Sequence, residues 1–144
     1  MVRIGRGIEL SQQGERDAAR DLFAEVWADI GAEGGDPLHR CALAHALADV
    51  QDAIDAELAW DLDAVAAADQ VTDEQAAQAG MAGPVAALYP SLHLNLGDCY
   101  RKLGRLDQAR EHLQLGRDAV GALPDDGYGR MIKGGLDRLA ERLT

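Results

Sequence analysis

The chain has 144 residues, of which 47% are hydrophobic and only 4% aromatic, and its net charge is −11. This is enough apolar material for a core, which excludes a disordered chain, and the abundance of Ala and Leu favours packed helices over a β-sandwich. The negative charge argues against a nucleic acid or an anionic membrane as the partner, and no apolar run approaches the ~20 residues of a membrane span. Since no signal-peptide pattern begins the chain and two cysteines make no disulfide framework, we expect a soluble cytoplasmic protein.

The charge is unevenly distributed along the chain. Residues 1–80 contain 17 acidic and 5 basic residues, whereas residues 81–144 contain 8 acidic and 9 basic ones. Between Asp49 and Glu74 there are nine acidic residues and no basic one. One interpretation is a solvated helix face, and the other is a negative surface that attracts a basic partner.

A pattern of five residues, separated by the same intervals, occurs three times in the chain. The three copies are Gly7, Leu10, Gly14, Ala19 and Phe23; Ala44, Leu47, Gln51, Ala56 and Trp60; and Gly97, Tyr100, Gly104, Ala109 and Leu113. The small first and fourth residues of each copy allow two helices to approach closely, and the large last residue fills the space beside them. Gly14 and Gly104 are expected in the turns between helices, where a positive φ costs glycine little. Asp52 and Asp107 are expected to cap the second helices or to favour their dipoles.

The third copy carries the clearest motif. Leu96-Gly97-x2-Tyr100 is followed by Gly104 and by Ala109-x3-Leu113, and this order resembles the tetratricopeptide repeat. His93 stands where that family prefers Trp, and Pro124 comes a few residues after the position of the final Pro. The resemblance implies three helix hairpins, at about residues 1–33, 37–70 and 90–123.

Two further segments complete the predicted fold. An insertion at about residues 71–89 opens with the capping-box pattern of Thr72 to Gln75, which predicts either a separate helix or an extension of the next one. A capping helix is expected at about 126–143, with Gly134-Gly135 packed closely on the third hairpin. Its apolar stripe contains Tyr128, Ile132, Leu136, Leu139 and Leu143. The prediction is one all-α domain, residues 1–144, folded as a short right-handed α-solenoid.

The resemblance also implies a function. Tetratricopeptide arrays are similar to curved scaffolds, so we expect a non-catalytic adaptor that docks a protein or peptide along a concave face formed by the first helices. Placed on the family pattern, the residues of that face are Ile4, Ile8, Leu38, Cys41, His45, Asp49, Leu94, Asp98, Arg101 and Lys102. The family's carboxylate clamp is absent, because Ile4, Ile8 and Ala42 stand where Lys and Asn are needed. A basic partner or an amphipathic helix is expected instead, unless the insertion or a second copy covers part of the face.

Two alternatives remain open. One is a self-assembling homo-oligomer, in which the acidic half of one copy contacts the neutral-to-basic half of another. The other is a small metal- or thiol-dependent enzyme, because Cys41 and His45 share a helix face with His39 nearby. No second ligand pair completes a metal site and no catalytic serine or phosphate-binding motif occurs, so we predict no cofactor, no metal and no enzymatic activity. Glu57 and Asp61, one turn apart, are interpreted as solvated surface.

Overall fold

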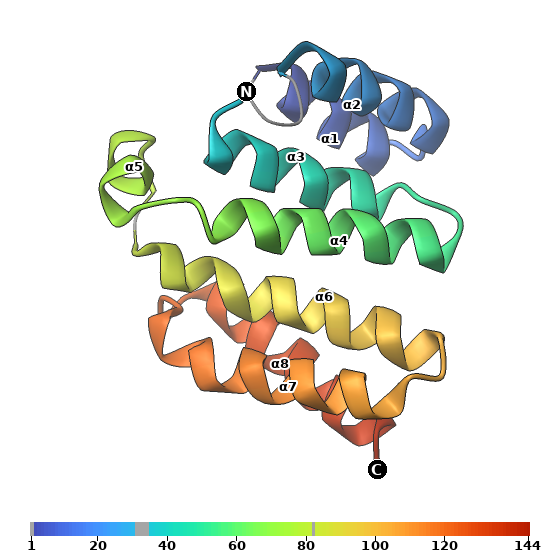
Figure 1. Cartoon of the computed structure of the whole chain (residues 1–144), viewed down its shortest axis with the longest axis vertical. Helices are drawn as coiled ribbons and strands as arrows, with labels where there is room; N and C mark the ends of the chain where they lie inside the picture. Colours follow the sequence, from blue (N-terminus) through green and yellow to red (C-terminus); the bar gives the residue numbers. More distant parts are fainter. Residues whose placement is uncertain (1, 31–34, 82) are drawn as a thin grey trace. The chain divides into compact units, whose positions relative to one another are not determined.

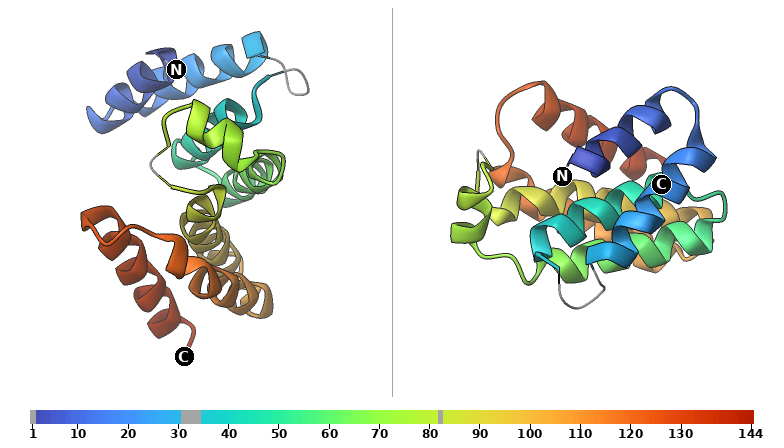
Figure 2. Two further views of the ribbon diagram at one scale, coloured as in Figure 1. Left: turned by 90° about the vertical axis from the view of Figure 1, so that its left-hand side faces the viewer. Right: turned by 90° about the horizontal axis from the view of Figure 1, so that it is seen from above.

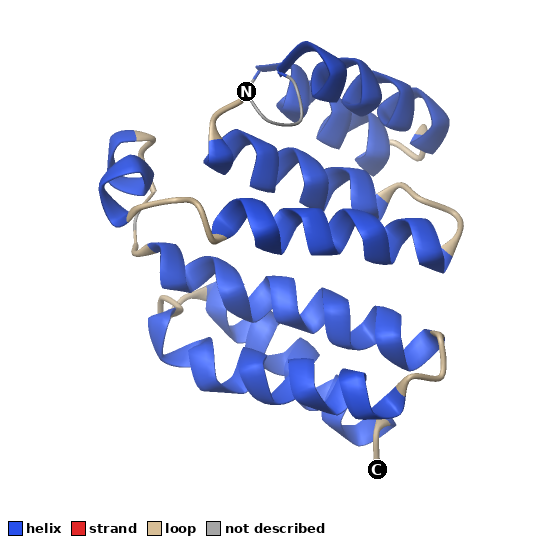
Figure 3. Cartoon of the chain, in the orientation of Figure 1, coloured by secondary structure: helices blue, strands red, loops and turns tan. Residues whose placement is uncertain are grey.

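The computed structural model describes residues 2–30, 35–81 and 83–144; residues 31–33, the predicted end of the first hairpin, lie outside the described residues. Within these ranges the chain forms eight α-helices and two short 3-10 helices and no strand, which confirms the all-α prediction (Figure 3). None of the described helices is both long and apolar enough to span a membrane. Contacts within the chain divide it into two compact parts, unit 1 (Met1–Gln70) and unit 2 (Val71–Thr144).

Unit 1 consists of two helix hairpins (Figure 1). Its helices are α1 (Val2–Gln12), α2 (Arg16–Ile30), α3 (Pro37–Asp49) and α4 (Ile54–Ala68). Gly14 closes the turn between α1 and α2 with a φ of 83°, as predicted. The N–H of Glu15 then donates to the carbonyl of Leu10 at 2.9 Å, so an otherwise unpaired carbonyl at the end of α1 is satisfied.

Side-chain carboxylates at the ends of α3 have different roles. Asp36 caps the start of the helix by accepting a hydrogen bond of 2.8 Å from the N–H of Leu38. The prediction that Asp52 caps α4 is wrong, because the N-cap residue is Ala53 and no side-chain bond is made there. Asp52 instead accepts a hydrogen bond of 3.1 Å from Arg20, which ties α2 to the turn between α3 and α4.

The core of unit 1 gathers around Phe23, whose side chain is 1% exposed. The other members of this buried cluster are Ile4, Ala19, Val26, Leu43, Ala46, Leu47 and Val50. Trp27 and Trp60 pack against the cluster with their rings edge to face and centroids 4.9 Å apart. A Cβ atom on Gly7 would lie 2.3 Å from the Phe23 ring, so α1 packs close to α2 only because Gly7 has no side chain.

Unit 2 contains the inserted segment, the third hairpin and the final helix. Its elements are α5 (Asp73–Gln78), η1 (Val85–Leu88), α6 (Tyr89–Lys102), α7 (Leu106–Ala119), η2 (Val120–Ala122) and α8 (Gly127–Arg142). The predicted capping box is present, with Thr72 and Gln75 bonding each other's backbone N–H, and it starts α5 as a separate helix. Gly104 closes the turn between α6 and α7 with a φ of 77°, as predicted.

The final helix, α8, packs against both α6 and α7 (Figure 2). Its close contact with α6 depends on Gly135, where an added Cβ atom would lie 2.7 Å from Leu94, so the predicted close packing of the paired glycines is found at Gly135 but not at Gly134, which faces only Arg138 of its own helix. Most of the predicted stripe is buried, but Tyr128 is 47% exposed. This correction has a simple cause: Gly129, one residue later, takes the buried position in the first turn of α8.

Candidate functional site

The residues predicted for the concave face have different environments in unit 1. Ile4 belongs to the core cluster and Cys41 is 4% exposed, so neither side chain is available to a partner, contrary to the expectation. The sequence pattern places both on first helices but does not show that neighbouring side chains cover them. The accessible or half-buried residues of the predicted set in unit 1 are Ile8, Leu38, His45 and Asp49.

Cys41 lacks the surroundings of a reactive cysteine. Burial raises the pKa of its thiol to about 11, so at neutral pH the group is a thiol. Nucleophilic attack and metal binding both require the thiolate. Among the residues that the structure describes, the group of three side chains able to hold a metal ion does not include Cys41 or His45. The thiol- or metal-enzyme alternative therefore has little support.

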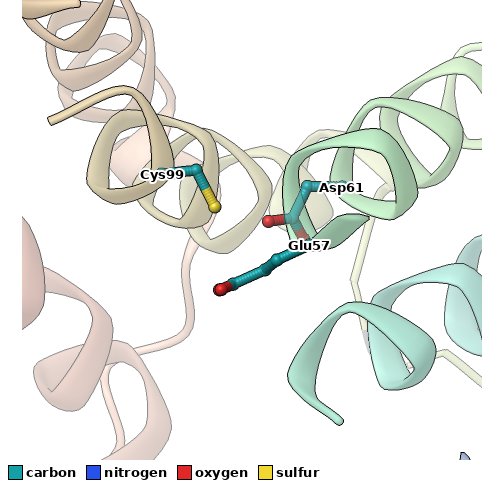
Figure 4. A group of neighbouring side chains, drawn as sticks. All are labelled: Glu57, Asp61 and Cys99. Carbon is teal, nitrogen blue, oxygen red and sulfur yellow. The ribbon is translucent and has the colours of Figure 1, made fainter. Parts of the chain in front are cut away.

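The interpretation of Glu57 and Asp61 as solvated surface is wrong for Asp61. Its side chain is 1% exposed and Glu57 is half-buried, and Figure 4 shows both on one side of α4. A signal for this burial exists in the sequence, since Asp61 continues the stripe of buried residues at Leu58 and Ala64. Because Asp61 lies within a long acidic segment, the sequence analysis did not assign it to that stripe.

Four residues of the predicted face lie along α6 in unit 2, and we call them the α6 face: Leu94, Asp98, Arg101 and Lys102. Leu94 is half-buried beside Gly135 of α8. The Asp98 carboxylate accepts a hydrogen bond of 2.8 Å from Arg101 and lies 3.2 Å from the Lys102 ammonium. Burial acts to raise the pKa of Asp98, but Arg101 and Lys102 outweigh it and lower the pKa below its ordinary value.

The final helix adds further charge beside the α6 face. One Nη atom of Arg142 lies 3.9 Å from the Asp98 carboxylate, and the Arg138 guanidinium folds back over Gly134. The structure therefore brings three cationic groups, those of Arg101, Lys102 and Arg142, within 4 Å of one carboxylate.

A histidine pair that the sequence analysis did not predict joins α6 to α7. The Nδ1 atoms of His93 and His112 are 3.0 Å apart. Tyr89 stacks on the His93 ring and Tyr100 on the His112 ring, with centroid separations of 5.9 and 5.3 Å. In a neutral pair one Nδ1 donates the proton and the other accepts it, so the two rings hold different tautomers.

We expect this pair to make unit 2 less stable as the pH falls. Burial lowers the pKa of His112, although Glu111 opposes the shift, so between that folded-state pKa and about 6.5 the unfolded chain binds more protons. The free energy of unfolding should fall on acidification below about pH 6.5, with a slope of at most about 1.4 kcal/mol per pH unit for one proton. Urea unfolding followed by circular dichroism from pH 7.5 to 5.5 measures the slope.

The variant His112→Asn supplies the control for this pH dependence. It keeps a polar side chain but removes the titrating ring, so its slope over the same range should be smaller than that of the wild type. An equal slope in the two proteins would show that other groups cause the effect. Two imidazole ¹⁵N patterns, one protonated at Nδ1 and one at Nε2, are expected in NMR spectra at pH 7.5.

Two surface hollows of about 430 Å³ each lie at equivalent turns of the first and third hairpins. One is lined by residues 14–18 and Asp52, and the other by residues 104–108 and Arg110. None of the residues predicted for the concave face lines either hollow. They are shallow features at the starts of α2 and α7, and their matching positions reflect the shared hairpin geometry.

The comparisons with known proteins agree with the repeat pattern. A family model described as tetratricopeptide repeat matches residues 1–25 and 90–114. These segments contain α1 with part of α2, and α6 with part of α7, so the match falls on the first and third predicted repeats and confirms the resemblance. No curated protein and no solved structure matches the chain.

Proposed function

We propose that this chain is a non-catalytic protein-binding module. The observation that carries the proposal is the tetratricopeptide match to residues 1–25 and 90–114, because such repeats generally mediate protein–protein interaction. The family is typically a scaffold without enzymatic activity. The burial and raised pKa of Cys41 support the same assignment by removing the best candidate nucleophile.

The proposed docking surface consists of the exposed sides of the first helices. In unit 2, Arg101 and Lys102 of the α6 face orient the partner through charge-assisted hydrogen bonds. In unit 1, the partly exposed Ile8 and Leu38 supply apolar contacts. The α6 face thus suits acidic groups of a partner, and the unit 1 surface suits its apolar groups. Ile4, Cys41 and the packed side chain of Leu94 are not part of the proposed contact.

Site-specific photocrosslinking in extract of the native cell tests this surface. A photoreactive amino acid replaces Ile8 or Lys102, both exposed on first helices, and matched controls place it at Glu25 or Leu115, exposed on second helices. We expect the same protein to be crosslinked from Ile8 and Lys102 and from neither control. Crosslinking from the second helices alone would contradict the proposed surface.

A further inference from the structure

The exposed side of α4 is a regular stripe of unusual composition. Asp55, Ala59, Leu62 and Ala66 are all exposed and recur every three or four residues, so they lie along one side of the helix. Leu62 is 44% exposed although it is a large apolar side chain. The helix contains four acidic residues and no basic residue. We call these four exposed residues the α4 stripe.

The exposed side of α8 has the opposite charge and a related pattern. The exposed Tyr128, Met131 and Arg138 and the half-buried Gly134 recur every three or four residues, and we call these four residues the α8 stripe. Met131 is 57% exposed and Tyr128 is 47% exposed. The helix contains four basic residues and two acidic ones, namely Arg130, Lys133, Arg138, Arg142, Asp137 and Glu141. Along the stripe, the two apolar side chains Tyr128 and Met131 are thus followed by Gly134 and one basic side chain, Arg138.

The two stripes match when the helices run antiparallel. Seven residues separate Asp55 from Leu62 and seven separate Met131 from Arg138, which at 1.5 Å per residue is about 10 Å in each case. If Asp55 lies opposite Arg138, then Leu62 lies opposite Met131. Ala59 then lies opposite Gly134, beside which the Arg138 guanidinium folds.

We propose that α4 of one copy docks antiparallel on α8 of a second copy. The contact joins different surfaces of the two molecules, so it is head-to-tail and can extend to further copies. The occupant follows from the complementarity of the two stripes: opposite charge at Asp55 and Arg138, and two large exposed apolar side chains at Leu62 and Met131. The proposal does not use the proposed docking surface on α1, α3 and α6, and it stands or falls independently of the proposed function.

Salt affects this contact in two ways. The net charge of −11 opposes association of two copies, and ions screen that long-range repulsion beyond about 10 Å at 0.1 M. The close pair of Asp55 and Arg138 is attractive and is weakened at higher salt. Association should therefore be strongest near about 0.1 M salt and weaker near about 1 M, where the screening length is about 3 Å.

Exchange of the charges between the two stripes tests the contact. Variant A carries Met131→Glu and Arg138→Glu, and variant B carries Asp55→Lys and Leu62→Lys. Each variant alone opposes like charges across the contact, whereas a mixture of A and B offers one native pair of stripes and one exchanged pair. All four positions are exposed, so the fold should tolerate the changes, and circular dichroism verifies this. Arg105→Glu with Leu115→Glu, both exposed and outside α4 and α8, changes the net charge as much as variant A does and is the matched control.

Sedimentation velocity measures the mass of the species in solution. The protein concentration is raised to about 1 mM, because weak complexes form in this range. We expect the wild type and the control to gain mass with concentration above 15.4 kDa, and A or B alone to associate at least about tenfold more weakly. The mixture of A and B should associate again. A wild type that stays at 15.4 kDa, variants that associate like the wild type, or a mixture that fails to associate would each overturn the proposal.

Discussion

Replacement of Phe23 by alanine is expected to destabilise unit 1 by about 3–5 kcal/mol. The ring is 1% exposed and lies in a cluster with side chains from α1, α2 and α3, so its removal leaves a cavity that no single helix can fill. A unit of this size has a total stability of roughly 3–10 kcal/mol at the usual value per residue. The substitution should therefore leave unit 1 marginally folded or unfolded.

Tryptophan fluorescence during urea unfolding measures this effect selectively. Trp27 and Trp60, the two tryptophans of the chain, both pack on the core of unit 1, so the fluorescence transition reports that unit. The control is Leu62→Ala, since Leu62 is 44% exposed and its removal should change stability by no more than about 0.5 kcal/mol. Equal transitions for Phe23→Ala and the wild type would contradict the described core.

Local backbone features are the part of the fold that the sequence predicts best. The turn glycines Gly14 and Gly104 and the capping box of Thr72 and Gln75 all have the predicted conformation. Each depends on the chemistry of a few neighbouring residues: a missing Cβ atom in a left-handed turn, or a hydroxyl within reach of an amide three residues later. Such features need no knowledge of which helices pack together.

The candidate site is predicted less well, because it depends on what covers each side chain. Repeat spacing places Ile4 and Cys41 on first helices, yet burial removes both from the accessible surface. The same limitation affects Asp61, whose charge suggests solvent exposure although its position continues a buried stripe. Spacing along one helix identifies a face, but the neighbouring helix determines whether that face is open.

Pairs of residues on different helices are the hardest to predict. His93 and His112 are 19 positions apart, and no local motif around either residue predicts the hydrogen bond of 3.0 Å between their rings. Arg142 approaches Asp98 only because α8 packs back on α6. The repeat pattern predicts that hairpins form, but the offset of one helix along its neighbour sets these distances. That offset is determined by side-chain packing at a few close contacts.

Gly7 and Gly5 provide a direct test of such a close contact. An added Cβ atom at Gly7 would lie 2.3 Å from the Phe23 ring, whereas at Gly5 nothing lies within 4 Å. Alanine is favoured over glycine in a helix by about 1 kcal/mol, so Gly5→Ala should stabilise unit 1 by up to that amount. Gly7→Ala should instead destabilise it by about 1–3 kcal/mol, because the buried ring cannot move aside without disturbing its neighbours.

The two substitutions lie two residues apart in α1, yet they are expected to change the free energy of unfolding in opposite directions, so the measurement distinguishes clearly between the outcomes. Urea unfolding followed by tryptophan fluorescence gives both free energies, and a second change examines the cause. In the Phe23→Leu background the side chain opposite Gly7 is smaller and more adaptable, so Gly7→Ala should cost less than in the wild type. If Gly7→Ala stabilised the protein as Gly5→Ala does, α1 would not lie against Phe23, and the spacing of small and large residues would have another origin.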